Sequence, residues 1–184
     1  MVFRSISRIA MHKKFLAIAG LIGVGVAGRL LPHVPNATPI TAITLAANKH
    51  VGRMWSFIVP ITAMVISDAF IGFYDWRILA SVYGSFLLIG CISQYMRKNS
   101  NPLTITLLAV AASIVFFLVT NFTVWLFSPW YEKSISGLLY CYTLGIPFLR
   151  NMLIGDIAYT FILLGALKTL TVLKVERRLR VKSA

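Results

Sequence analysis

Long apolar runs without charge are the feature that most limits how this chain can fold. The clearest is Leu103–Phe127, 25 residues that include no Asp, Glu, Lys or Arg. A helix of that length crosses the hydrocarbon core of a bilayer, which is about 30 Å thick. Only 12% of the 184 residues are charged, and the mean hydropathy is +0.81. Since soluble domains carry about 25% charged residues, the sequence predicts an integral membrane protein.

Charges and turn residues divide the apolar sequence into six helical segments. We predict an all-α membrane protein whose six-helix transmembrane bundle forms a single domain, residues 1–184. Residues 1–14 are expected to be a cytoplasmic N-terminus, 15–173 the bundle, and 174–184 a basic cytoplasmic tail. The expected helices are 15–31, 38–48, 54–73, 76–96, 103–127 and a last one from about Pro147. A break near Gly145 should separate that last helix from a short re-entrant or interfacial piece that begins at Gly137.

Basic residues are distributed unevenly between the two ends of these helices. The chain has 18 Lys and Arg against 5 Asp and Glu. With six crossings and a cytoplasmic N-terminus, 14 of the 18 lie on the cytoplasmic side, as the positive-inside rule requires. We therefore expect a multi-pass protein of the bacterial inner (cytoplasmic) membrane with both termini in the cytoplasm. The basic clusters lie beside apolar segments and suit the lipid bilayer as partner, and no motif indicates nucleic acid.

A proline-rich stretch, residues 29–40, interrupts the first apolar region. It holds Pro32, Pro35 and Pro39 together with several polar residues. Proline fixes φ and removes a backbone donor, so no continuous helix passes through this stretch. Irregular backbone at membrane depth persists only where it is buried in protein or lines an aqueous cavity. The stretch is therefore a candidate for one wall of a ligand site.

Polar residues in three later stretches reach the same outer end of the bundle under this topology. Polar groups inside a membrane are costly unless they are paired or face water, so they are functional candidates. The predicted substrate-binding residues are Arg29, His33, Asn36, Thr38, Asp68, Asn121, Trp125, Tyr142, Asn151 and Asp156. We expect Asp68 and Asp156 to pair with Arg29 and Arg150, and the alternative to a substrate cavity is that these ion pairs only hold the bundle together.

Motifs for catalysis are missing from the sequence. There is no phosphate-binding glycine loop, no histidine or cysteine spacing typical of a metal site, and no nucleophile–base arrangement. Cys91 and Cys141 lie in separate apolar segments and form no disulfide framework. We therefore expect no catalytic residue, no metal and no cofactor, and a protein that is not an enzyme.

Small residues follow one face of the first apolar helix. Ala19, Gly23 and Ala27 are spaced by four residues, which lets another helix approach closely. The face is a candidate for docking a partner protein. Packing against another helix of the same chain requires the same groove, and the sequence leaves both interpretations open.

Four motifs of this chain resemble those of a family of uncharacterised bacterial membrane proteins. They are the stretches at 29–40, 67–73, 120–125 and 137–156. That family in turn is similar to the S components of energy-coupling factor (ECF) vitamin transporters. The resemblance implies an S-component-like fold and a subunit that captures a vitamin, or another scarce small molecule or metal ion, near the outer face. It also implies docking of the first helix onto a shared transmembrane coupling subunit with ATPases. A scaffold without transport activity, or a small membrane enzyme using Asp68 or Asp156, is the alternative.

Overall fold

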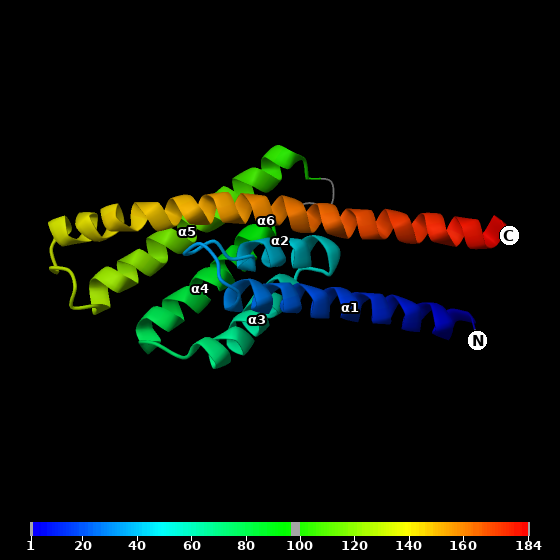
Figure 1. The fold of residues 1–184 in the computed structure, drawn as a ribbon, viewed down its shortest axis with the longest axis horizontal. Helices are drawn as coiled ribbons and strands as arrows, with labels where there is room; N and C mark the ends of the chain where they lie inside the picture. The colour runs from blue at the N-terminus through cyan, green and yellow to red at the C-terminus, as the bar shows by residue number, and fades with distance from the viewer. Residues whose placement is uncertain (1, 97–99, 184) are drawn as a thin grey trace.

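The computed structural model describes residues 2–96 and 100–183, with side chains described for 14–96 and 100–169. Within these ranges all regular structure is helical (Figure 1). The helices are α1 (Val2–Leu30), α2 (Ile40–His50), α3 (Trp55–Ile71), α4 (Trp76–Ser93), α5 (Pro102–Phe127) and α6 (Ile135–Ser183). The predicted all-α, six-helix bundle is confirmed.

Three helices are long and apolar enough to cross a membrane. Among the described residues they are α4, α5 and the Ile135–Thr169 part of α6, and α3 is a shorter apolar helix. Most of their side chains face outward from the bundle, as expected for helices that contact lipid. These helices indicate a membrane protein, as the sequence predicted.

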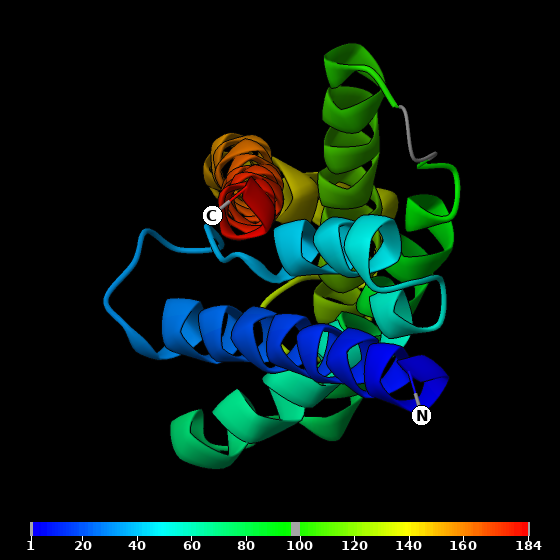
Figure 2. The same cartoon turned by 90° about the vertical axis from the view of Figure 1, so that its right-hand side faces the viewer.

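Helix α2 lies at the centre of the bundle and is too short to cross a bilayer. Its 11 residues extend about 16 Å at 1.5 Å per residue. Every residue from Ile40 to Ala47 is buried, and α2 contacts all five other helices. Figure 2 shows it between α1 and α6, where the loop of residues 31–39 leads back into the bundle. The segment predicted as the second span is therefore a core helix, and that prediction is corrected.

Helix α6 is continuous where the sequence predicted a break. It runs through Gly145 and Pro147 without interruption. A β-carbon at Gly145 would lie 2.7 Å from the Asn121 and Phe117 side chains of α5, so this glycine permits close helix packing. Proline is tolerated inside membrane helices because neighbouring groups satisfy the freed carbonyl. The first helix likewise differs from prediction, because α1 begins at Val2 rather than near Phe15.

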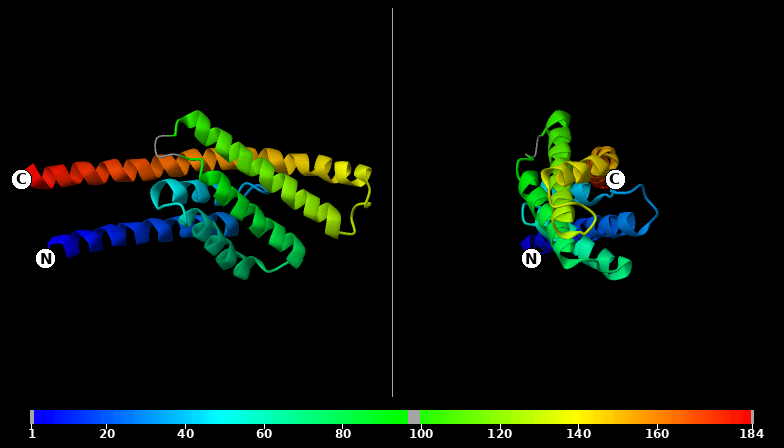
Figure 3. Two further views of the ribbon diagram at one scale, coloured as in Figure 1. Left: turned by 180° about the vertical axis from the view of Figure 1, so that it is seen from behind. Right: turned by 90° about the vertical axis from the view of Figure 1, so that its left-hand side faces the viewer.

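The two ends of the chain lie on the same side of the molecule. Figure 3 shows the N-terminal end of α1 and the C-terminal end of α6 together, with the 128–134 loop at the opposite end. The apolar core between these ends is centred on α2 and includes Ile43, Leu45, Val59, Met64 and Ile89, all fully buried or nearly so. The start of α1 and the end of α6 therefore lie on one side of the molecule.

Candidate functional site

A cavity of about 250 Å³ lies at the C-terminal end of α1, partly enclosed by the 31–39 loop. Each described helix contributes to its wall, and so does the 72–75 loop between α3 and α4. The lining residues are Arg29, His33, Asn36, Thr38, Ile40, Met64, Ile71, Tyr74, Val82, Phe86, Phe116 and Met152. Four of the predicted substrate-binding residues, Arg29, His33, Asn36 and Thr38, are therefore brought together around one space.

Polar groups line the mouth of this cavity and apolar groups form its floor. His33 and Asn36 are exposed, whereas Ile40, Met64 and Met152 are buried. The Phe86 and Phe116 rings pack against each other with centroids 5.2 Å apart. An apolar cavity with a few polar groups at one end is the usual composition of a small-molecule site.

Two glycines hold the 31–39 loop against the bundle. A side chain at Gly28 of α1 would collide with the Pro39 ring, and one at Gly155 of α6 would lie 3.0 Å from Ala37. Asn36 has φ 64°, a left-handed conformation that asparagine tolerates better than most residues. The loop therefore has a fixed path, which positions the polar groups of the cavity mouth.

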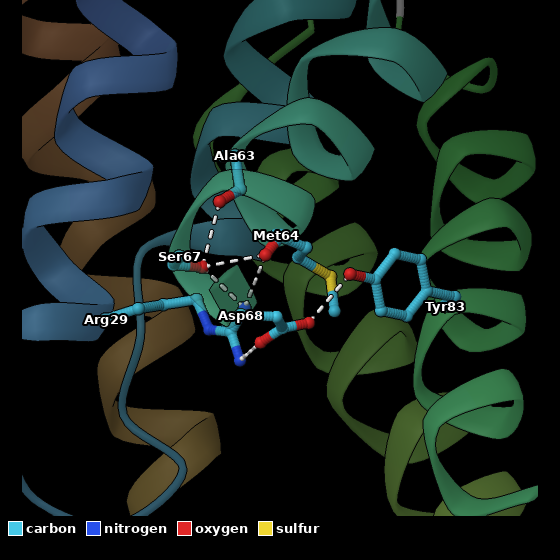
Figure 4. Close-up of polar contacts among 6 residues, drawn as sticks. All are labelled: Arg29, Ala63, Met64, Ser67, Asp68 and Tyr83. Atoms are coloured by element: carbon cyan, nitrogen blue, oxygen red, sulfur yellow. Dashed lines mark hydrogen bonds and ion pairs between the residues drawn. The ribbon is translucent and has the colours of Figure 1, made fainter. Parts of the chain in front are cut away.

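Arg29 is anchored to α3 by a buried polar network (Figure 4). Its Nη2 atom lies 2.6 Å from Asp68 Oδ1. Its Nη1 atom donates to Ser67 Oγ at 2.7 Å and to the Met64 carbonyl at 3.3 Å. The Tyr83 hydroxyl of α4 donates to Asp68 Oδ2 at 2.7 Å. The predicted Arg29–Asp68 ion pair is thus confirmed, and it joins α1, α3 and α4.

This network sets the electrostatics of the cavity. Because Asp68 neutralises Arg29, the wall offers hydrogen bonds rather than a net positive charge. Tyr74, in the 72–75 loop, also lines the cavity. Partial burial, followed by the nearby Asp68 carboxylate, raises the pKa of the Tyr74 phenol, and Arg29 opposes this. The phenol therefore remains a hydrogen-bond donor at neutral pH.

Asp156 is buried but does not pair with Arg150. The Ser113 hydroxyl of α5 lies 2.7 Å from Asp156 Oδ2, and the Thr41 side chain of α2 also hydrogen-bonds the carboxyl group. Arg150 is exposed. Six helical residues separate the two side chains by about 120° around the axis, at about 100° per residue. The predicted Arg150–Asp156 pair is therefore wrong.

The remaining predicted residues lie away from the cavity. Asn121 contacts Gly145 of α6 and donates to its own helix at Phe117 O, 2.9 Å away. The Tyr142 hydroxyl donates to Leu118 O at 2.9 Å, and Trp125 Nε1 to Glu132 O at 2.8 Å. These three side chains join α5 to α6 and to the 128–134 loop. Asn151 is half-buried and does not line the cavity.

A second hollow runs along the outer face of α1. This apolar groove of about 640 Å³ is lined by Phe15, Ile18, Ala19, Ile22, Gly23, Val26, Ala27 and Leu30, with Ile66 from α3. It contains all three predicted docking residues, Ala19, Gly23 and Ala27, and a β-carbon at Gly23 would meet nothing within 4 Å. Close packing inside the chain uses Gly25 and Gly28 instead. The face of Ala19, Gly23 and Ala27 therefore points outward and is not used for packing against another described helix of this chain.

Sequence reasoning missed several residues that shape the site. Gly28 and Gly155 clamp the loop, Tyr83 anchors Asp68, and Ser113 binds Asp156. A signal existed for the glycines, because each directly precedes a predicted polar residue, Arg29 or Asp156. Among the described residues no group of three or more His, Cys, Asp or Glu side chains is arranged to hold a metal ion.

Comparison with known proteins gives a family but no described activity. No curated protein and no solved structure matches the chain. A family model described as "Family of unknown function (DUF6580)" matches residues 9–179. The likeness to ECF S components stays a prediction. Because the match covers nearly the whole sequence, the chain belongs to DUF6580, a family of unknown function.

Proposed function

We propose that this protein is a substrate-binding membrane subunit that captures a small molecule in the Arg29–Thr38 cavity. The observation that carries the proposal is the convergence of all the described helices on one cavity with a polar mouth and an apolar floor. Such cavities are the usual form of small-ligand sites. In this role the protein acts as the S component of an ECF-type uptake transporter.

The size and chemistry of the cavity limit the ligand. At about 250 Å³ it lies just below the range of about 300–1,000 Å³ that is usual for drug-sized ligands. Since Arg29 is neutralised by Asp68 at 2.6 Å, a strongly anionic ligand gains little from it. A compact ligand with an apolar body and one hydrogen-bonding end fits best, and scarce micronutrients such as vitamins include molecules of this kind.

The placement of the cavity suits uptake from outside the cell. It lies at the C-terminal end of α1, away from the side where α1 begins and α6 ends. The topology predicted from the sequence assigns 14 of the 18 Lys and Arg residues to that side, and by the positive-inside rule we take it as cytoplasmic. In a bacterial inner membrane the cavity then opens toward the outer face.

The α1 groove suits a partner subunit. The sequence holds no phosphate-binding glycine loop, and we assign ATP hydrolysis to a partner protein. The groove around Ala19, Gly23 and Ala27 is open and apolar, which allows a helix of a transmembrane coupling subunit to approach closely. This coupling subunit, with its ATPases, is the proposed partner.

Chemical extraction tests the proposal. The purified protein should release a small molecule that mass spectrometry identifies, and Thr38→Val should weaken its binding about 2- to 12-fold, the effect of losing one neutral hydrogen bond of about 0.5–1.5 kcal/mol. Thr143→Val is the matched control, because Thr143 is exposed on α6 and its hydroxyl bonds only its own helix. If the protein releases no small molecule, or if Thr38→Val and Thr143→Val bind it equally, the cavity is not the capture site. A scaffold without ligand would then be the better account.

A further inference from the structure

A second polar cluster lies inside the bundle, separate from the Arg29–Asp68 network. It consists of Asp156 on α6, Ser113 on α5 and Thr41 on α2. None of the three side chains is more than 1% exposed. Thr160, one helical turn beyond Asp156, is also buried, and its hydroxyl has no hydrogen-bond partner among the described residues. A buried carboxyl group whose hydrogen-bond partners among the described residues are hydroxyls requires an explanation.

Hydrogen-bond accounting assigns a proton to this carboxyl group. Ser113 Oγ lies 2.7 Å from Asp156 Oδ2 and 3.1 Å from the Ala109 carbonyl. A hydroxyl has a single hydrogen to donate, so it cannot donate to both oxygens. If Asp156 is protonated, it donates to Ser113 Oγ, and Ser113 donates to Ala109 O. Both contacts are then satisfied, whereas an ionised carboxylate leaves one of them unmade.

No cation of the described residues pairs with the carboxyl group. Asp156 forms no ion pair within the described part of the chain. Helix α6 packs on α5 and α2; α5 carries no titratable residue, and α2 carries only Lys49 and His50, in its last turn. The other titratable groups near this part of α6 are His33 in the loop and Arg150, Tyr159 and Lys168 on α6; of these only Tyr159 is even half-buried. A lone ionised carboxylate in such surroundings is strongly disfavoured.

The cluster is adjacent along its three helices to residues of the cavity floor. Each member lies close in the chain to a lining residue on the same helix: Asp156 is four residues after Met152, Ser113 three before Phe116, and Thr41 directly after Ile40. Residues three or four apart on a helix share a face. The cluster therefore lies within about one helical turn of the floor residues Met152, Phe116 and Ile40.

We propose that Asp156, together with Ser113 and Thr41, forms a proton-binding site beneath the cavity floor. While the floor is closed the carboxyl group carries the proton on Oδ2. When the floor opens and water enters, the O–H bond of Oδ2 breaks, the proton passes to water, and Ser113 turns its hydrogen to the carboxylate. The protonation of Asp156 and the closure of the floor are then linked, and this link holds whatever ligand the cavity takes.

Infrared spectroscopy of the full-length protein in lipid tests the site with the proton itself as the probe. At neutral pH the wild type should show the C=O stretching band of a protonated carboxylic acid. Asp156→Asn should lose the band, and Ser113→Ala should shift it, because one hydrogen bond to the acid is gone. Asp75→Asn is the control, because Asp75 is an exposed N-cap residue, and it should leave the band unchanged.

The pH dependence of the same band tests the link to the floor. Raising the pH should remove the band, and Met152→Ala should move this loss to lower pH, because water reaches the acid more easily. A wild type without the band, or a band that persists in Asp156→Asn, would overturn the proton site. If added Na⁺ rather than raised pH removes the band, the cluster is a cation site and the proposal is also wrong. Identical pH profiles for wild type and Met152→Ala would refute the link to the floor.

Discussion

Two buried aspartates with different environments define the polar interior of this protein. Asp68 has a cation 2.6 Å away and a tyrosine hydroxyl at 2.7 Å. Asp156 has hydroxyl partners and no cation among the described residues. Removing one member of a buried ion pair leaves an uncompensated charge, so the two sites should respond differently to neutral substitutions.

Loss of one partner of the Arg29–Asp68 pair should destabilise the protein severely. Arg29→Met and Asp68→Leu should each lower the unfolding free energy by about 3–5 kcal/mol. The double variant should be more stable than either single one, because it leaves no isolated charge. Thermal unfolding in detergent measures this. Strictly additive effects of the two changes would show that the pair contributes no coupling.

Asn36 should be sensitive to its backbone conformation as well as to its side chain. At φ 64° a residue with a β-carbon is disfavoured by about 1–2 kcal/mol, and glycine is not. Asn36→Ala should therefore be less stable than Asn36→Gly, while both lose the amide that faces the cavity mouth. Melting temperature and ligand affinity, measured side by side, separate the two effects. Equal melting temperatures would show that the loop relaxes.

At the scale of elements, local signals predicted the helix boundaries well where caps are strong. Asp75 accepts the Arg77 and Ile78 backbone amides at the start of α4, and Asn101 accepts that of Thr104 at the start of α5. The continuity of α6 was not predictable, because the effect of Pro147 depends on how neighbouring helices satisfy the backbone. The buried position of α2 was equally hidden, since its length and hydropathy do not show what surrounds it.

The candidate site was predictable only where its residues are adjacent in the sequence. The 31–39 loop supplied its polar residues directly from the sequence. Asn121 was misplaced because the face of α5 that meets the cavity cannot be read from one sequence. Five residues separate Asn121 from Phe116, which lines the cavity, and at about 100° per residue the two side chains point about 140° apart.

The two kinds of glycine on α1 should behave oppositely on substitution. Gly23→Leu should leave the melting temperature nearly unchanged, because a side chain there meets nothing within 4 Å. Gly25→Leu should destabilise the protein, because a β-carbon would lie 2.6 Å from Ile43. Gly23→Leu should nevertheless abolish co-purification with a coupling subunit if the groove is the docking face. Unfolding of Gly23→Leu, or intact association, would contradict that role.

At the scale of the whole molecule, the start of α1 and the end of α6 share one side, and the cavity lies toward the other. This arrangement follows from the direction of the helices. The positive-inside count predicts that the side with the two chain ends is cytoplasmic. Helix α2 and the 31–39 loop together return the chain toward the side where α1 begins. The sequence predicted a full span for this return.

Reporter fusions test the orientation. Fusions after Arg53 and after Ala184 should report the cytoplasm, and one at Pro129 should report the outside. With both termini in the cytoplasm, the predicted topology assigns 14 of the 18 basic residues to the cytoplasmic side, as the positive-inside rule requires. An external C-terminus would reverse the orientation of the cavity and remove uptake from the outside as its function.

The most direct test of the central claim, that the cavity holds a small molecule, is native mass spectrometry of the intact protein. The wild type should carry a discrete additional mass. Val82→Phe, which fills the cavity from α4, should lose it, and Leu88→Phe, at an exposed position of the same helix, should keep it. A wild type without bound mass, or the same bound mass in Val82→Phe, would contradict the account.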